Sequence, residues 1–533
     1  MRASRIATRL ALVLAAAALA AGTAACGELA PPTVNPADPN TISVMAGSEV
    51  KDMEPILADL KKATGVTIVP TYVGSLDGAE QIDSGASTDA AWFSLGNYLR
   101  LLPNASKRIV ASNKIMLSPV VIGVKKSVAD SFGWTNNPNV TWADIEAKAA
   151  DGSFRFAMTN PAASNSGFCA LVGVATALSG SSDAIDNGTI DTTALANFFK
   201  GQTLTAGSSG FLADDFVRQQ DSVDGVINYE SVLMSLNSGG QLKEPLELIY
   251  PKEGIVTADY PFILLNKAKL DAYNKAVAWL LDPAQQRRIM TDVSRRPAVP
   301  GIALDPKFPS QTLISLDFPS KLDTVRTLIS TYLNQVRKPA SAVFVLDTSG
   351  SMSGDRLDNL KHALTQLTGV DQSLTGQFSS FRAREEITFI TFSTQVNDVS
   401  TFTIDDTDPN GADMSAIRNY IDGLSADGNT AIYSALETAY STVDKEIATD
   451  PNRLYSIVLM TDGENNSGAS SGDFDASYSS LAPAVQAVHV YPILFGDAAV
   501  SDMQSIASTT GGTVFDAETT SLDSIFKQIR GYQ

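Results

Sequence analysis

Apolar residues occur along the chain in two patterns, as short runs and at helical spacing. Short apolar runs predict β-strands at residues 41–46, 66–73, 120–125, 226–228, 246–250 and 262–265. Segments 52–64 and 270–281 carry apolar residues three and four positions apart, which predicts amphipathic helices. Strands that alternate with such helices indicate an α/β domain. We assign this domain to residues 41–335.

A second α/β unit follows a short join at residues 332–341, in which Pro339 ends a helix. Residues 342–347 are apolar on both faces, as in a strand that helices cover on both sides of a sheet. The later order of strands and helices predicts a doubly wound α/β domain at residues 340–533. Residues 522–529 have one apolar face and predict a last helix packed on the sheet, with no later domain to restrain it.

The first residues have the pattern of an export signal. Arg2, Arg5 and Arg9 precede an apolar stretch at 10–21, and small residues lead to Cys26. The stretch is shorter than the roughly 20 residues that span a bilayer, so we expect cleavage after residue 25. A cysteine at this place resembles the bacterial lipobox, although Thr23 departs from the usual leucine. The resemblance implies lipidation of Cys26; a secreted protein and an uncleaved anchor are the alternatives.

Residues 26–40 are rich in proline and predict a semi-extended tether, which would hold the folded part at the outer face of the cytoplasmic membrane. The protein has 58 acidic and 39 basic residues among 533, a formal charge of −19. Removal of the export signal takes away three arginines and no acid, so the exported part is more acidic still. Such a charge repels nucleic acid and favours cations or basic partners.

Few side chains are available for catalysis or for a disulfide scaffold. The chain has only two cysteines and two histidines. Cys169 lies in an apolar stretch and is expected in the core. His362 and His489 have no recognisable partners for a catalytic triad. We therefore expect a binding protein and no enzyme.

Hydroxyl and carboxylate side chains follow the apolar strand at 342–347. Asp347, Ser349 and Ser351 form the sequence Asp-Thr-Ser-Gly-Ser, Thr430 stands in a turn that opens a helix, and Asp462 ends another buried strand. Ligands of open α/β sheets gather at the carboxyl ends of strands, where these residues are expected. A hard divalent ion prefers such oxygen ligands. Alternatively, the Asp-Thr-Ser-Gly-Ser segment is a strand-to-helix turn whose polar side chains cap the helix.

Together these segments resemble the von Willebrand factor A (VWA) domain and its metal-ion-dependent adhesion site. The resemblance implies that Ser349 and Ser351 bind Mg²⁺ or Mn²⁺ directly, and that Asp347, Thr430 and Asp462 bind it directly or through water. With two carboxylates the ion is only just neutralised and stays electrophilic. An Asp or Glu carboxylate of a protein partner would complete its coordination.

Residues 41–335 resemble, in their layout, the bacterial extracellular solute-binding proteins with two α/β lobes. The resemblance implies a cleft between the lobes in which hydroxyls and helix N-termini hold a small polar solute. Each candidate residue could equally serve in a turn or a helix cap. The candidates are Ser48, Ser75, Ser164, Ser166, Tyr229 and Glu230. If Glu230 faces the cleft, its carboxylate would oppose an anionic ligand.

Two functions of different classes follow. The first is a lipid-anchored interaction protein that grips a partner's carboxylate through its metal and recognises a partner with its two lobes. The second is the substrate-binding receptor of an ABC importer, with the carboxy-terminal domain as a docking accessory. A neighbouring permease and ATPase reading frame would favour the second.

Overall fold

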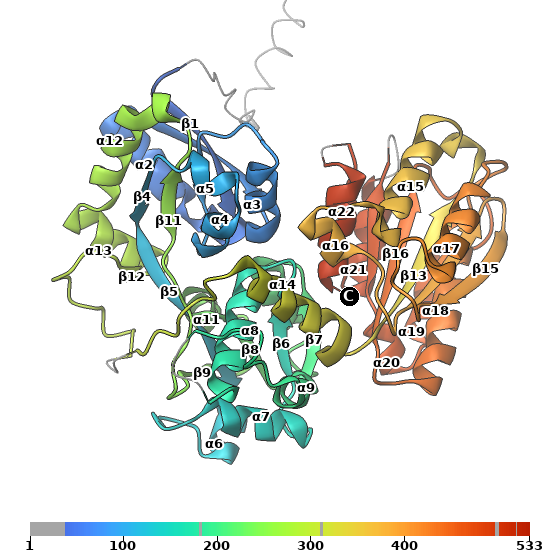
Figure 1. Ribbon diagram of the computed structural model, residues 1–533. Helices are drawn as coiled ribbons and strands as arrows, with labels where there is room; N and C mark the ends of the chain where they lie inside the picture. Colours follow the sequence, from blue (N-terminus) through green and yellow to red (C-terminus); the bar gives the residue numbers. More distant parts are fainter. Residues whose placement is uncertain (1–37, 181–183, 310–312, 496–499, 519, 533) are drawn as a thin grey trace, which may run out of the picture.

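The computed structural model describes residues 38–180, 184–309, 313–495, 500–518 and 520–532. These residues form three α/β bodies, which are two lobes followed by a carboxy-terminal domain (Figure 1). The predicted fold class, a two-lobed α/β domain followed by a doubly wound α/β domain, is confirmed. The predicted export signal and Cys26 lie outside the described residues, as does most of the tether.

Lobe 1 is built on a five-stranded sheet of order β2-β1-β3-β11-β4, in which β11 runs antiparallel to its two neighbours. The strands are β1 (Thr41–Gly47), β2 (Thr67–Val73), β3 (Ala90–Trp92), β4 (Ala111–Lys114) and β11 (Pro261–Leu264). The helices are η1 (Ser48–Met53), α2 (Glu54–Thr64), α3 (Ser75–Asp83), α4 (Asn97–Leu101), α5 (Ala105–Arg108), η2 (Lys267–Lys269), α12 (Leu270–Leu280) and α13 (Pro283–Asp292). Helix α2 buries Ile56 and Leu60 on one face, as the helical spacing predicts.

Lobe 2 contains a seven-stranded sheet around the long strand β5, which begins where the chain leaves lobe 1. The strands are β5 (Met116–Lys125), β6 (Phe156–Thr159), β7 (Gln202–Ala206), β8 (Gly225–Tyr229), β9 (Leu246–Ile249), β10 (Thr257–Ala258) and β12 (Arg296–Pro297). The helices are α6 (Lys126–Phe132), α7 (Trp142–Ala150), α8 (Asn165–Leu178), α9 (Thr192–Phe199), α10 (Ser209–Arg218) and α11 (Glu230–Ser238). Cys169 is buried in α8, so its predicted place in the core is confirmed.

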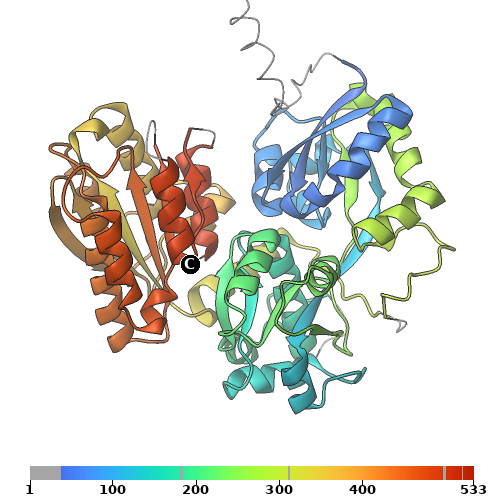
Figure 2. The same ribbon diagram turned by 180° about the vertical axis from the view of Figure 1, so that it is seen from behind.

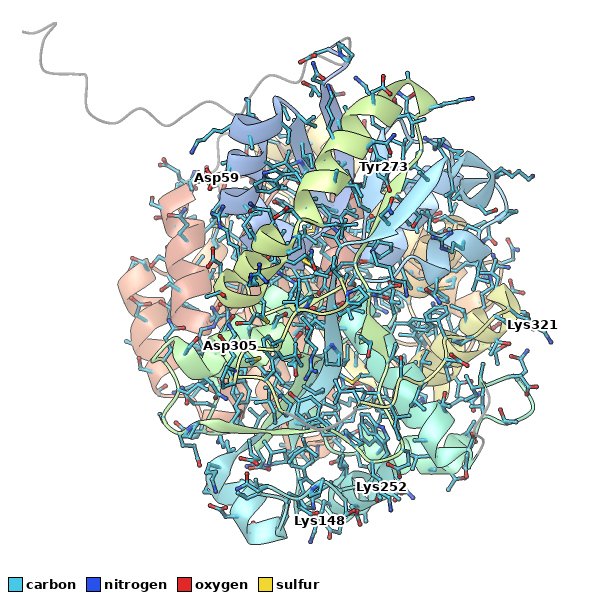
Figure 3. The ribbon with its side chains drawn as sticks, turned by 90° about the vertical axis from the view of Figure 1, so that its left-hand side faces the viewer. Asp59, Lys148, Lys252, Tyr273, Asp305 and Lys321 are labelled. Carbon is cyan, nitrogen blue, oxygen red and sulfur yellow. The ribbon has the colours of Figure 1, made fainter. Side chains whose placement is uncertain are left out.

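The chain crosses between the lobes more than once. Figure 3 shows the side of the molecule on which the irregular segment around Asp305 runs. Asp59 and Tyr273 lie on lobe 1, Lys148 and Lys252 lie on lobe 2, and Asp305 lies on the irregular segment between them. Helix α14 (Leu322–Thr331) and the π-helical turn η3 (Tyr332–Val336) then pack on α8 and α9 of lobe 2. They lead directly into the carboxy-terminal domain.

The carboxy-terminal domain has a six-stranded sheet of order β15-β14-β13-β16-β17-β18, in which β15 alone pairs antiparallel. Its strands are β13 (Ala340–Asp347), β14 (Glu386–Phe392), β15 (Val396–Thr403), β16 (Leu454–Thr461), β17 (Val490–Leu494) and β18 (Phe515–Asp516). Its helices are η4 (Gly350–Met352), α15 (Asp355–Thr365), η5 (Gln366–Val370), α16 (Leu374–Ser379), α17 (Ala412–Asp422), α18 (Ile432–Thr449), α19 (Ser471–Ser479), α20 (Pro483–Gln486), α21 (Val500–Thr510), α22 (Leu522–Ile529) and η6 (Arg530–Tyr532). The predicted last helix is confirmed at its predicted bounds.

The end of the chain packs against lobe 2. Our expectation that no other domain restrains the last helix is therefore wrong. The Asn160 side-chain amide donates to the Arg530 carbonyl oxygen (3.3 Å), and Gly531 lies directly against Gly207. Nearby, the Gln219 amide meets the His489 ring nitrogen (2.8 Å). Helices α22 and α21 therefore lie on the side of the domain that faces the lobes (Figure 2). The expectation considered only domains that would follow the last helix in the sequence, whereas lobe 2, which precedes it, supplies the restraining contact.

Among the described residues, no helix combines the length and the apolar character that crossing a bilayer requires.

Candidate functional site

The predicted metal-site residues come together at the carboxyl edge of the β13–β16 strand pair. In this parallel register Leu346 lies beside Met460, so the ends of the two strands are level. The Thr461 hydroxyl donates to Asp347 Oδ2 at 2.6 Å. Asp462 follows immediately. Because both strands are covered on both faces, their apolar residues fix the position of the two carboxylates.

A chain of hydrogen bonds links four of the five predicted ligands. The Ser349 amide donates to Asp347 Oδ1 (2.8 Å), and the hydroxyls of Ser349 and Ser351 are 3.0 Å apart. The Ser351 hydroxyl then donates to Asp462 Oδ1 at 2.7 Å. These oxygens therefore already stand within hydrogen-bonding reach of one another.

The fifth residue, Thr430, approaches the same place from the turn before α18. A Cβ placed on Gly463 would be 3.4 Å from Thr430 Oγ1 and 3.8 Å from Ser351 Oγ, so both hydroxyls flank this glycine. The Asn466 side chain holds the turn, since its oxygen accepts from the Thr430 amide at 2.8 Å. Asn466 was missed in the sequence because one asparagine in a polar loop gives no signal.

Arg356 is a second participant that sequence reasoning missed. It lies in the first turn of α15 and forms an ion pair with Asp462 Oδ2. Its side chain is 37% exposed, whereas the carboxylate of Asp462 is fully buried. A fixed cation thus holds one of the two carboxylates that a metal would need.

The electrostatics of this site favour a cation. Burial raises the pKa of Asp347, and the neighbouring charge of Asp462 raises it further, against the hydrogen bonds from Thr461 and Ser349. Among the described residues no three His, Cys, Asp or Glu side chains gather as in a metal cluster. The five residues here are instead two carboxylates and three hydroxyls, an all-oxygen set that fits a hard ion such as Mg²⁺.

A second candidate site is a cavity of about 460 Å³ between the lobes. Ser48, Ser75 and Ser164, three of the predicted solute ligands, line it. Next to Asn165, which lines the cavity, the lobes touch, because Ser94 Oγ of lobe 1 meets the Tyr229 hydroxyl (2.7 Å) and accepts from the Asn165 amide (2.6 Å) of lobe 2.

The other three predicted solute ligands lie elsewhere. The Ser166 hydroxyl is buried among those of Thr159 and Ser209, at 2.9 and 2.8 Å. Tyr229 is buried outside the cavity lining, with its hydroxyl against Ser94. Glu230 is buried in a bidentate ion pair with Arg296, with both contacts at 2.7 Å, so its charge is matched away from the cavity. Residues that line the cavity without having been predicted include Glu49 and Phe211.

Comparisons with known proteins match the two domains separately. Residues 42–291 match the family model of the bacterial extracellular solute-binding protein, and residues 342–528 match that of the von Willebrand factor type A domain. The chain is 29% identical over 171 residues to mouse (Mus musculus) calcium-activated chloride channel regulator 1, covering 32% of this chain and 16% of the relative. It is 30% identical over 135 residues to human inter-alpha-trypsin inhibitor heavy chain H3, covering 25% and 14%. The chain thus spans less than a fifth of these curated relatives.

Solved structures also resemble each part. The periplasmic binding protein AfuA from Actinobacillus pleuropneumoniae is 13% identical, with a TM-score of 0.43, and the match covers 56% of this chain and 98% of that one. A von Willebrand factor type A structure from Catenulispora acidiphila is 16% identical, with a TM-score of 0.28, covering 37% and 43%.

The chain therefore combines a two-lobed solute-binding-like domain with a carboxy-terminal VWA domain. Domains of these two classes typically bind or adhere and do not catalyse.

Proposed function

We propose that the protein is an exported, lipid-anchored protein of the cell envelope that binds a protein partner through a divalent ion held by the carboxy-terminal domain. The observation that carries this proposal is the meeting of Asp347, Ser349, Ser351 and Asp462 at the carboxyl edge of the sheet. Solute-binding relatives of the two-lobed domain support export.

The five residues would divide the work of holding the ion. Ser349 and Ser351 offer neutral hydroxyl oxygens, Asp347 and Asp462 neutralise the charge, and Thr430 offers a further hydroxyl. When bound, the ion supplies an electrophilic position for an Asp or Glu carboxylate of the partner. The hydrogen bond from Thr461 and the buried strand ends hold the carboxylates in place, so little ordering is needed when the ion enters.

Calorimetry with MgCl₂ or MnCl₂ on the mature chain tests the metal site. We expect Asp347→Ala and Asp462→Ala to abolish the binding heat while circular dichroism stays native. Asp358→Ala, which changes an exposed carboxylate on α15, serves as the matched control and should bind like wild type. If wild type gives neither heat nor a thermal shift with either ion, the metal site is refuted.

Partner binding needs a separate experiment. Wild type immobilised with Mg²⁺ should retain an envelope protein that EDTA releases, and the Asp462→Ala variant should not retain it. Retention that survives EDTA would show that partner binding does not pass through the metal.

The cavity between the lobes supports a second candidate function, a receptor that delivers a small solute to a membrane importer. The observation that favours it is a mixed polar and apolar cavity at the place where a two-lobed receptor closes on its ligand. Native mass spectrometry of protein purified under mild conditions would detect a retained solute. A chain that carries none and binds none from a metabolite library would refute the receptor.

A further inference from the structure

The cavity between the lobes has a third wall, which the carboxy-terminal domain provides. Lobe 1 contributes Tyr72 and lobe 2 contributes Phe211, while the carboxy-terminal domain contributes Phe378 of α16 and Tyr532 of η6. Close packing of Gly531 on Gly207 holds the end of the chain there. A solute in this cavity would therefore contact both domains at once.

Glu49 brings a carboxyl group with a buried, unpartnered oxygen to the cavity. It lies in η1, directly after β1, and its Oε1 atom is buried and accepts no hydrogen bond among the described residues. Burial raises the pKa of Glu49, and the positive charge of Arg295 opposes this shift. A buried carboxylate oxygen without a donor is costly, so a ligand that donates to it would be stabilised.

The nearby cationic side chains are largely paired with other groups, although the buried Nε atom of Arg295 has no hydrogen-bond partner among the described residues. Both contacts of Arg295 Nη1 are with the carboxylate of Asp52 (2.7 and 2.6 Å), and its Nη2 donates to the main-chain oxygen of Glu49 at 2.7 Å. At the third wall, Lys527 pairs with Asp371 (3.1 Å) and Arg530 pairs with Glu385 (2.7 Å). An anionic ligand would thus meet Glu49 without a dedicated counter-ion.

Aromatic rings surround the same space. Tyr72, Phe211, Phe378 and Tyr532 come from all three bodies, and the rings of Phe211 and Tyr532 are 6.4 Å apart. Phe211 is 37% exposed, although the neighbouring Leu212 and Phe216 on α10 are buried. Faces of aromatic rings attract organic cations, most strongly where water is excluded.

We propose that the cavity binds a small organic cation, with its ammonium group at Glu49 and its apolar body among rings of both domains. The inference rests on the receptor function proposed above and specifies its ligand class. The cavity volume of about 460 Å³ suits a compact amine, and all three bodies line it. The carboxy-terminal domain thus completes the solute site instead of only adjoining it.

Titration calorimetry on the mature chain tests this with choline, putrescine and phenethylamine as probes. At least one of these cations should bind. If choline binds, its uncharged isostere dimethylbutanol should bind at least about tenfold more weakly. Glu49→Gln should weaken cation binding by about tenfold or more, because a charge-assisted hydrogen bond is lost. Glu146→Gln on α7, outside the cavity, is the matched control and should leave the affinity unchanged.

A separate variant tests the wall that the carboxy-terminal domain provides. Phe378→Leu should weaken cation binding by about threefold or more, since the ring is replaced by an apolar side chain without a π face. Phe402→Leu on strand β15 is the control. Binding of the cation that is insensitive to Glu49→Gln overturns the inference, and so does the failure of all three cations to bind. If phosphate, sulfate or a neutral solute binds instead, the receptor function survives and the ligand class is wrong.

Discussion

Arg356 places a fixed positive charge on one of the two carboxylates of the proposed metal site. The guanidinium group of Arg356 pairs with Asp462 Oδ2, while Asp462 Oδ1 accepts from Ser351. An entering ion must therefore share Asp462 with a cation that the chain itself supplies. This arrangement would weaken metal binding without removing any of the five predicted ligands.

We expect Arg356→Gln to raise the affinity for Mg²⁺ by about threefold to tenfold, because a partly exposed ion pair is worth roughly 1 kcal/mol. Calorimetry with MgCl₂ gives the two dissociation constants. Lys361→Gln, which removes a positive charge further along α15, controls for the general change in charge. Equal or weaker affinity in the Arg356 variant would mean that the arginine supports the site instead of competing with the ion.

His489 makes the contact between the domains sensitive to acid. Burial lowers the pKa of His489 to about 4, with a further contribution from Arg218, whereas an unfolded histidine titrates near 6.5. The unfolded state therefore binds more protons between these values, and this histidine makes the folded state less stable as the pH falls from about 6.5 to 4.

We expect wild type to lose about 1–2 kcal/mol of stability between pH 7 and 5 relative to His489→Gln, as measured by urea unfolding at each pH. The His489→Gln variant is the reference because Asp215 also titrates in this range. Burial raises the pKa of Asp215 to about 6, so this carboxyl group changes the stability with pH in the opposite direction. Parallel pH profiles of the two proteins would rule out His489 as the titrating group.

At the scale of elements, the link between α22 and lobe 2 depends on two glycines. A Cβ on Gly531 would stand 2.6 Å from the Gly207 Cα, a separation that the backbone of lobe 2 cannot relieve without shifting. The same turn carries the main-chain oxygen of Arg530, which accepts from Asn160. The end of the chain is therefore held by backbone proximity as much as by side chains.

We expect Gly531→Ala to destabilise the protein by about 1–3 kcal/mol, as overpacking of a close contact does, and to loosen the two domains. Thermal unfolding and small-angle scattering measure these two effects. Gly210→Ala is the control on the adjacent helix α10, since a Cβ there meets nothing within 4 Å. Wild-type stability and scattering of the Gly531 variant would show that the contact does not hold the domains together.

At the scale of the whole molecule, the proposed function depends on where the protein is held. Lipidation of Cys26 would place both binding sites at the outer face of the membrane on a short tether. Among the described residues no helix offers an alternative span. Replacing Cys26, the predicted site of lipidation, therefore tests where the protein is held.

We expect Cys26→Ser to move the protein from the membrane fraction to the soluble fraction, because acyl chains are the only proposed anchor. Wild type washed in high salt with EDTA is the control and should remain with the membrane. A variant that stays with the membrane under this wash would indicate an uncleaved signal or a tightly bound partner.

The sequence by itself predicted the fold class and the last helix, and it pointed to the residues of the proposed metal site. Runs such as 342–347 and the amphipathic segment 522–529 are local patterns, and periodicity reports them directly. Strands β3 and β6 were not predicted, since three or four residues give only a weak period, whereas the equally short β9 and β11 were found as apolar runs.

Only the tertiary structure decided which side chains meet. It directed Glu230 to Arg296 and away from the cavity, brought Glu49 to the cavity, and set Arg356 on Asp462. It also placed the end of the chain on lobe 2, about 320 residues earlier in the sequence. Charge pairing and enclosure depend on how whole bodies pack, and residue spacing along the chain does not encode that.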